Sequence, residues 1–135
     1  MTEAELQTQV ADYIRLRYPK ALFHSDFGSG IKLTMGQAMK QKRQNGGRRA
    51  WPDMFIAEPV EGVYDDICGL FLELKKDGTR LKKKNGDWAS EHIAEQAEVL
   101  KELRIRGYAA HFAVGFEDAK RIIDGYLGEW TQTTL

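Results

Sequence analysis

Three features that help to assign the class of a protein are scarce or missing in this chain: cysteine, long apolar runs and an excess of charge of one sign. The single cysteine, Cys68, has no disulfide partner within the chain, so we expect a reducing compartment and, because it lies in an apolar run, a small core residue. No apolar run approaches the roughly 20 residues that cross a bilayer, and the acidic, polar N-terminus is unlike a signal peptide. The sequence therefore predicts a soluble cytoplasmic protein of 135 residues with no membrane partner.

Several patterns that carry known chemistry are also absent. The three histidines, His24, His92 and His111, share no metal-ligand spacing, and we interpret His24 and His111 as core or edge residues of strands. No serine has a convincing partnered base, and the glycine-rich segment 25–30 lacks the Gly-Lys-Ser/Thr ending of a phosphate-binding loop. These absences argue against a zinc site, a serine nucleophile and a nucleotide-binding loop.

The balance of 20 basic and 20 acidic residues conceals a segregation of charge along the chain. Segment 32–49 holds six basic residues and no acid, segment 75–84 holds six basic residues and one acid, and segment 53–73 holds six acids and no base. The local field of such segments matters more than their sum. The two basic segments are therefore candidates for binding nucleic acid, although either could instead be a solvated loop.

Hydrophobic periodicity predicts an α/β protein with a central sheet flanked by helices. The order along the chain is helix, strand, short helix, strand, strand, helix, strand, helix. The expected elements span residues 2–18, 21–24, 34–44, 54–57, 67–75, 90–106, 108–114 and 116–127. Residues 1–128 then form one domain, and residues 129–135 form a C-terminal tail.

Capping boxes are expected at the start of two helices. Thr2 and Glu5 would cap the first helix, and Thr34 and Gln37 would cap the short one. Because Glu5 already has this structural role, Glu3 is left with none except a favourable charge at a helix N-terminus.

A carboxylate is set into each of two strongly apolar, strand-like runs. Asp53 stands at the start of one run, and Glu73 and Lys75 lie within the other. Alternation places Glu73 and Lys75 on one face of their strand, where the two charges are costly to bury unless they pair or bind something. If the strands are neighbours that start from one side of the sheet, Asp53 comes within reach of Glu73, because adjacent strands lie about 4.8 Å apart.

Two carboxylates that close repel each other unless a divalent cation lies between them. Mg²⁺ suits the arrangement, because it takes oxygen ligands, needs few protein contacts and keeps positions open for water and phosphate. Asp53, Glu73 and the backbone carbonyl of Leu74 are the expected ligands. Lys75 could orient the attacking water or neutralise charge on the phosphate, and Gln96 could hold the water or Lys75. The alternative is a structural ion pair without a metal.

With these residues the chain resembles the PD-(D/E)XK nuclease superfamily and, within it, the small stand-alone VRR-NUC domains of phages and bacteria. The resemblance covers nearly the whole chain. It runs from Glu3-x-x-x-Gln7, through Gly46-Gly47-Arg48-Arg49-Ala50-Trp51-Pro52-Asp53, to Glu73-Leu74-Lys75, Gln96 and Gly107-Tyr108. Trp51 departs from the family, in which a small aliphatic residue often precedes Pro-Asp. This departure concerns the shape of the loop and the substrate preference rather than the metal site.

The resemblance implies a restriction-endonuclease-like core with a mixed central sheet. It also implies that Asp53 and Glu73 bind Mg²⁺ or Mn²⁺, that Lys75 is catalytic, and that Glu3 and Gln96 complete the site. Stand-alone members resemble dimeric DNA endonucleases that act on branched DNA such as Holliday junctions. We therefore expect a metal-dependent deoxyribonuclease of DNA repair or recombination in a bacterium or a phage-infected host. We also expect a homodimer, because one site per chain can cut two strands symmetrically only in a pair of chains.

The basic segments then have a role in binding DNA. Phosphates on either side of the scissile bond would be gripped by Arg48, Arg49, Lys82, Lys83 and Lys84. The three lysines lie between the turns Asp77-Gly78 and Asn85-Gly86, which bracket a loop or a two-stranded flap. Trp51 or Trp88 could stack on an exposed base, but burial in the core or at a subunit contact explains either residue equally well.

Two other functions fit the same residues. The fold could be retained as a catalytically silent DNA-binding module, which would keep the basic segments but would not need Asp53, Glu73 and Lys75 together. The chain could also be a subunit-contact protein in which these three charges only pair.

Overall fold

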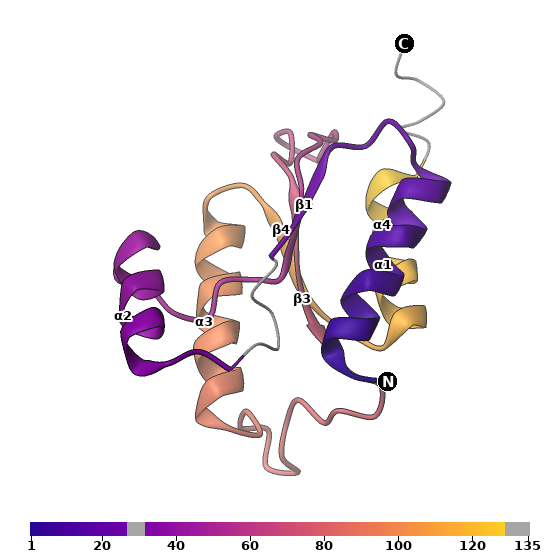
Figure 1. The fold of residues 1–135 in the computed structure, drawn as a ribbon. Coiled ribbons are helices and arrows are strands. Elements are labelled where there is room, and N and C mark those ends of the chain that lie inside the picture. Colours follow the sequence, from indigo (N-terminus) through magenta and orange to yellow (C-terminus); the bar gives the residue numbers. More distant parts are fainter. Residues whose placement is uncertain (27–31, 129–135) are drawn as a thin grey trace.

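The strands form a four-stranded mixed sheet in the order β1-β2-β3-β4 in the computed structural model, which describes residues 1–26 and 32–128 (Figure 1). β1 (Phe23–Ser25) and β3 (Leu70–Lys75) both run antiparallel to β2 (Met54–Ile56), and β4 (Ala109–Val114) runs parallel to β3. The predicted α/β fold with a mixed central sheet is confirmed. The expected tail 129–135 and most of the glycine-rich segment 25–30 lie outside the described residues.

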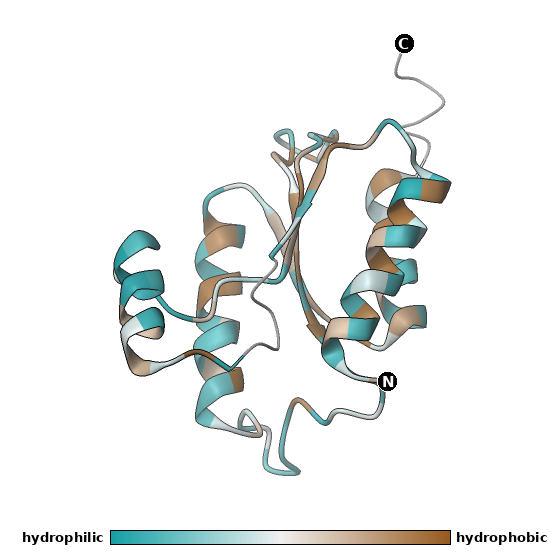
Figure 2. Cartoon of the chain, in the orientation of Figure 1, coloured by the Kyte–Doolittle hydropathy of each residue, from teal (hydrophilic) through white to brown (hydrophobic). Residues whose placement is uncertain are grey.

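Helices cover both faces of the sheet. α1 (Glu3–Arg17) and α4 (Phe116–Leu127) lie on one face, and α3 (Glu91–Ile105) lies on the other, with α2 (Met35–Gln44) outside it (Figure 1). Apolar residues of α1, α3 and α4 gather toward the sheet, whereas α2 is largely hydrophilic (Figure 2). In the described part of the chain, no helix has both the length and the apolar character needed to cross a membrane.

Both expected capping boxes are present. Thr2 Oγ1 accepts a hydrogen bond from the Glu5 N–H at 3.1 Å, and Glu5 Oε2 accepts one from the Thr2 N–H at 3.2 Å. Thr34 and Gln37 make the same reciprocal pair at 3.1 and 3.0 Å. The starts of α1 and α2 are therefore set by local chemistry that is visible in the sequence.

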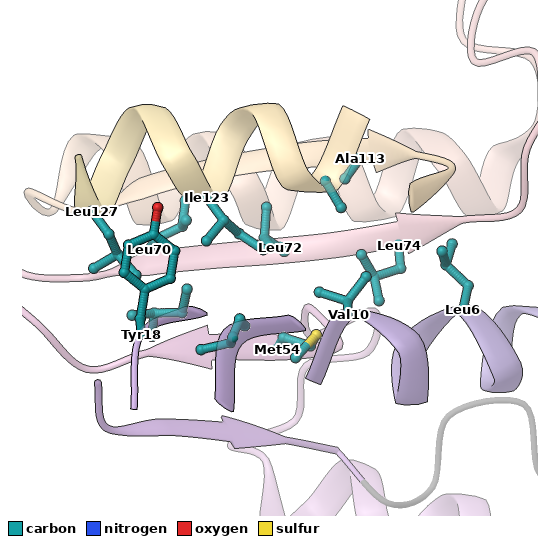
Figure 3. Close-up of a cluster of buried hydrophobic side chains, with 13 residues drawn as sticks. Leu6, Val10, Tyr18, Met54, Leu70, Leu72, Leu74, Ala113, Ile123 and Leu127 are labelled. Atoms are coloured by element: carbon teal, nitrogen blue, oxygen red, sulfur yellow. The ribbon is translucent and has the colours of Figure 1, made fainter. Parts of the chain in front are cut away.

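The pleat of β3 divides its side chains between two apolar clusters. Three leucines pack between the sheet and the α1/α4 layer (Figure 3): Leu70, Leu72 and Leu74. Phe71 belongs to the cluster under α3. Because side chains alternate along a strand, Glu73 and Lys75 share the α3 face with Phe71, as predicted.

The segment before β3 differs from the prediction in two respects. β3 begins at Leu70 rather than at Ile67, which makes only an isolated bridge to Val60. Cys68, expected in the core, is exposed. Its N–H donates to the Gly107 carbonyl at 2.9 Å, so the backbone is fixed while the thiol stands in a connection outside the sheet. The apolar run thus predicted a longer strand and one more core residue than the structure has.

Side chains from the two flanking helices occupy the outer edge of β4. Arg104 Nη1 donates to the Ala110 carbonyl at 2.7 Å, and Asp118 Oδ2 accepts from the Val114 N–H at 3.0 Å. Both backbone groups point away from β3, since the adjoining residues Ala109 and Gly115 donate to the β3 side. These contacts satisfy two backbone groups of an edge that would otherwise present them unpaired.

One carboxylate joins α1 to α4. Tyr13 and Tyr18 each donate a hydroxyl to Asp124 Oδ1, at 2.6 and 2.7 Å. Burial raises the pKa of Asp124, but the two hydrogen bonds, with the charges of Lys120 and Arg17, more than offset this and hold the pKa below its usual range. Burial, followed by the contact with Asp124, raises the pKa of Tyr13 to about 12. The contact is therefore charge-assisted.

Replacing Asp124 with alanine is expected to lower the free energy of unfolding by about 2–3 kcal/mol, because two partly buried hydroxyls lose a charged acceptor. Urea denaturation at pH 7 measures the change. The same contribution should fade in the wild-type protein as the pH falls below 3.8, since a depressed carboxyl pKa stabilises the fold only above that range. Asp12→Ala, which removes an exposed ion pair within α1, is the control and should change stability little. Equal effects in the two variants would contradict the prediction.

Candidate active site

All five residues predicted to be catalytic line one pocket of about 480 Å³: Glu3, Asp53, Glu73, Lys75 and Gln96. They come from the start of α1, the start of β2, the end of β3 and the second turn of α3. Figure 1 shows the N-terminus of α1 beside the C-terminal end of β3. Residues separated by up to 93 positions along the chain therefore meet at one end of the sheet.

Asp53 reaches Glu73 by a different route from the one predicted. The two strands do not start from one side; β2 runs antiparallel to β3, so the start of β2 meets the end of β3. Asp53 Oδ2 accepts a hydrogen bond from the Leu74 N–H at 2.7 Å. The carbonyl of a strand residue points to the same side as its N–H, so the Leu74 carbonyl also faces the Asp53 side.

Glu73 is buried at the centre of the pocket, with 4% of its surface exposed. Its Oε1 accepts a hydrogen bond from Gln96 Nε2 at 2.5 Å and lies 4.0 Å from Lys75 Nζ. Its Oε2 has no hydrogen-bond partner among the described residues. Gln96, expected to hold the water or Lys75, uses its amide N–H on Glu73, and its Oε1 has no hydrogen-bond partner among the described residues. One oxygen of Glu73 is therefore fixed by protein contacts, and the other is left for a ligand.

The environment of Glu73 disfavours its negative charge. Burial, followed by the nearby charge of Asp53, raises the pKa of Glu73 to about 9, and the ammonium of Lys75 offsets only part of this. Lys75 is itself buried, with 6% of its surface exposed. A divalent cation between Asp53 and Glu73 would supply the missing positive charge.

The N-terminus of α1 closes the pocket beside β3. Because Glu5 is used in the capping box, Glu3 is free of that role, and its Oε2 accepts from the Lys76 N–H at 3.4 Å. One turn later, Gln7 Nε2 donates to Ser25 Oγ and to the Asp26 carbonyl. The first helix thus connects the end of β3 to the end of β1.

This arrangement can be compared with solved structures. One of them, described as a "VRR_NUC domain protein", has a TM-score of 0.67 and 26% sequence identity, and the match covers 94% of this chain and 88% of that chain. The resemblance to VRR-NUC domain proteins is confirmed. No family model matches the chain, and no curated protein matches it. The VRR-NUC neighbour agrees with a restriction-endonuclease-like core, a nuclease fold.

The donor set of this pocket fits a hard cation with few protein ligands. Two carboxylates, one with an unpartnered buried oxygen, and the Leu74 carbonyl would provide oxygen ligands. Within residues 1–26 and 32–128, no group of three or more His, Cys, Asp or Glu side chains is arranged to hold a metal ion. Such a site suits Mg²⁺ or Mn²⁺, which keep water and phosphate among their ligands, better than a cation that needs a full protein cage.

The predicted DNA-binding residues fall into two groups. Arg48 and Arg49 line the pocket, and the guanidinium of Arg48 forms an ion pair with Glu102 on α3. Lys82, Lys83 and Lys84 do not line it. They lie in a loop closed by an isolated bridge between Lys82 and Trp88, with Lys82 Nζ 4.8 Å from the centre of the Trp88 ring. The flap-like loop was thus anticipated, but its lysines stand apart from the carboxylates.

Sequence reasoning missed several residues that line the pocket. His92 has no metal-ligand spacing in the sequence, yet it lines the pocket and lies one turn before Gln96 on the same face of α3. The i, i+4 spacing from Gln96 was the signal that could have found it. Met35 and Met39 of α2 also line the pocket, and nothing in the sequence indicated where α2 would lie.

Proposed function

We propose that the protein is a DNA endonuclease that uses Mg²⁺ or Mn²⁺ to hydrolyse phosphodiester bonds and prefers branched DNA such as Holliday junctions. The observation that carries this proposal is the convergence of Asp53, Glu73 and Lys75 in one pocket, with an unpartnered oxygen on the buried Glu73. Two carboxylates and an ammonium at one end of the sheet can bind a cation and a phosphodiester at the same time. The VRR-NUC neighbour supports a nuclease fold.

Each residue has a role that follows from its contacts. Asp53, Glu73 and the Leu74 carbonyl would hold the cation, which supplies Lewis acidity toward the phosphate and lowers the pKa of a water. Lys75 Nζ, 4.0 Å from Glu73 Oε1, is near enough to neutralise charge that develops on the phosphate or to orient the attacking water. Gln96 is a positioning residue, since its amide fixes the orientation of the Glu73 carboxyl.

The remaining features concern the substrate and the assembly. Glu3 completes the acidic end of the pocket, and Arg48 and Arg49 would contact phosphates beside the scissile one. Lys82, Lys83 and Lys84 would contact the DNA farther from the cut. A homodimer would present two such pockets to the two strands of a junction, as DNA repair or recombination in the cytoplasm of a bacterium or a phage-infected host requires.

A catalytically silent DNA-binding module is the second candidate. It is favoured by the lack of a three-carboxylate group within the described ranges 1–26 and 32–128. A silent module would retain the basic residues and would bind DNA without cutting it. The two candidates make opposite predictions for the same assay.

The deciding experiment incubates the protein with a four-way junction, a flap, a nicked duplex, a linear duplex and a single strand, each with Mg²⁺, Mn²⁺ or EDTA. We expect cleavage in either metal and none in EDTA, with the four-way junction cut at least about tenfold faster than the linear duplex, because contacts to phosphates select by shape. Sizing of the protein in solution tests the dimer. Binding without cleavage in both metals would support the silent module, and neither binding nor cleavage would reject both candidates.

A further inference from the structure

The pocket is lined by two unlike sets of side chains. The catalytic wall is the set of carboxylates with Lys75, and the apolar wall is a set of three large apolar side chains: Met35, Met39 and Trp51. These side chains are exposed to 81%, 66% and 42% of their surfaces. Exposed apolar groups scattered singly need no explanation, but apolar groups that line one pocket together with a few polar and charged groups are typical of a ligand site.

The apolar wall is not a by-product of core packing. α2 has no buried residue, although its capping box fixes it as a helix. Met35 and Met39 are one turn apart and therefore lie on one side of α2, and Lys42 continues the same side toward the pocket. The apolar face of this helix is turned toward the open space of the pocket and not toward the sheet.

The backbone before Trp51 points to the same conclusion. Ala50 has φ of 63°, a left-handed conformation that is unfavourable for a residue with a side chain. Pro52 follows Trp51 and restricts Trp51 to extended conformations. The loop therefore holds the indole over the pocket at a conformational cost, and such strain is concentrated at functional sites.

We infer that the wall formed by Met35, Met39 and Trp51 binds an unstacked nucleobase of the DNA strand whose phosphate occupies the Asp53–Glu73–Lys75 wall. This inference rests on the proposed function and names the part of the DNA by which the protein would recognise its substrate. A base offers a flat π-face to an indole, and thioether sulfurs make favourable contacts with aromatic rings. Lys42 and Arg49 line the same pocket and supply positive charge near the strand.

The size and position of the pocket fit one nucleotide. About 480 Å³ lies within the range of small-ligand sites and is enough for one unstacked nucleotide. A base must leave the stack to reach the apolar wall, which costs least where the strand is already unpaired or branched. The wall thus gives a physical reason for cutting at branch points, independent of contacts to base edges.

The experiment combines a change in the protein with a change in the DNA. The substrate is a branched DNA with one unpaired nucleotide at the cleavage position, compared with the same DNA carrying an abasic site there. We expect the wild-type protein to cut the abasic DNA on the order of tenfold more slowly, since stacking on one aromatic side chain is worth that much or more. In Trp51→Ala and in Met39→Ala the ratio of the two cleavage rates should fall toward one. Leu16→Ala, which changes an exposed apolar residue of α1 that does not line the pocket, should retain the full difference.

A binding measurement separates this inference from the proposed function. 2-Aminopurine replaces the unpaired base, and Lys75→Met protein with Mg²⁺ serves as the host so that DNA stays intact. Binding should quench the 2-aminopurine fluorescence. Loss of this quenching when Trp51→Ala is added to Lys75→Met supports the base site, even if no variant cleaves DNA. Cleavage of the abasic and normal DNA at equal rates, or fluorescence that does not respond to binding, would overturn the base site and leave the nuclease proposal standing.

Discussion

Replacing Lys75 with methionine is expected to lower the rate of DNA cleavage on the order of 10³-fold while leaving DNA binding within about threefold of wild type, as expected for a group that acts on the transition state. The Lys75 side chain is buried and its Nζ lies 4.0 Å from Glu73 Oε1, so it can act only on what occupies the pocket. Methionine has a similar length and no charge, so the packing on the α3 face of β3 should survive. Single-turnover cleavage at saturating protein, together with a binding titration in Ca²⁺, measures the two effects separately.

Lys101→Met is the matched control for this prediction. Lys101 is an exposed residue of α3, and the same substitution there removes one positive charge without touching the pocket. We expect its cleavage rate to remain within about twofold of wild type, because a single distant charge contributes little at physiological salt. If Lys75→Met cleaved DNA as fast as Lys101→Met, Lys75 would be a structural partner of Glu73 and not a catalytic residue.

Replacing Glu73 with glutamine is expected to abolish cleavage and yet stabilise the metal-free protein at pH 8 by roughly 2 kcal/mol, since a buried group that resists ionisation is replaced by a neutral one. Burial and the charge of Asp53 raise the Glu73 pKa from 4.5 to about 9. A raised carboxyl pKa stabilises the fold fully below pH 4.5, and this contribution is lost as the pH rises toward 9. The wild type should therefore lose stability relative to Glu73→Gln across that interval. Urea denaturation at several pH values in EDTA checks the sign.

Metal should reverse the order of stability of the wild type and Glu73→Gln. At a Mg²⁺ or Mn²⁺ concentration of 100 times Kd, the wild type should gain about 2.7 kcal/mol, and Glu73→Gln should gain little. Because the raised pKa keeps a proton on Glu73, metal binding should release a proton, which calorimetry in two buffers of different protonation enthalpy detects. Glu61→Gln, an exposed acid in a distant loop, should respond as the wild type does. A wild-type protein that neither binds Mg²⁺ or Mn²⁺ nor releases a proton would rule out the proposed metal site.

The elements that could be predicted are those whose cause is local. Thr2 and Thr34 indicate the starts of helices because each capping box is formed within four consecutive residues. Glu73 and Lys75 were assigned to one face of a strand because alternation does not depend on what the strand pairs with. The candidate site followed from the same local features, since a carboxylate within an apolar run is costly wherever the run lies.

The features that could not be predicted depend on how distant segments meet. Asp53 and Glu73 are neighbours because β2 and β3 pair antiparallel, whereas the sequence was equally compatible with strands that start from one side. Cys68 lies in an apolar run, but the strand begins two residues later and leaves the thiol outside. The approach of Met39 to the pocket depends on where α2 rests, and that helix has no buried face to indicate it.

The contacts at the outer margin of β4 also limit how two copies of the chain can associate. Arg104 and Asp118 already use the Ala110 carbonyl and the Val114 N–H, so a neighbouring strand would have to displace both side chains before it could join the ladder. Among residues 1–26 and 32–128, the strand at the opposite margin of the sheet is β1, with three residues. A two-fold pair built as one continuous sheet is therefore disfavoured. Helices and loops would have to form the interface of the proposed homodimer.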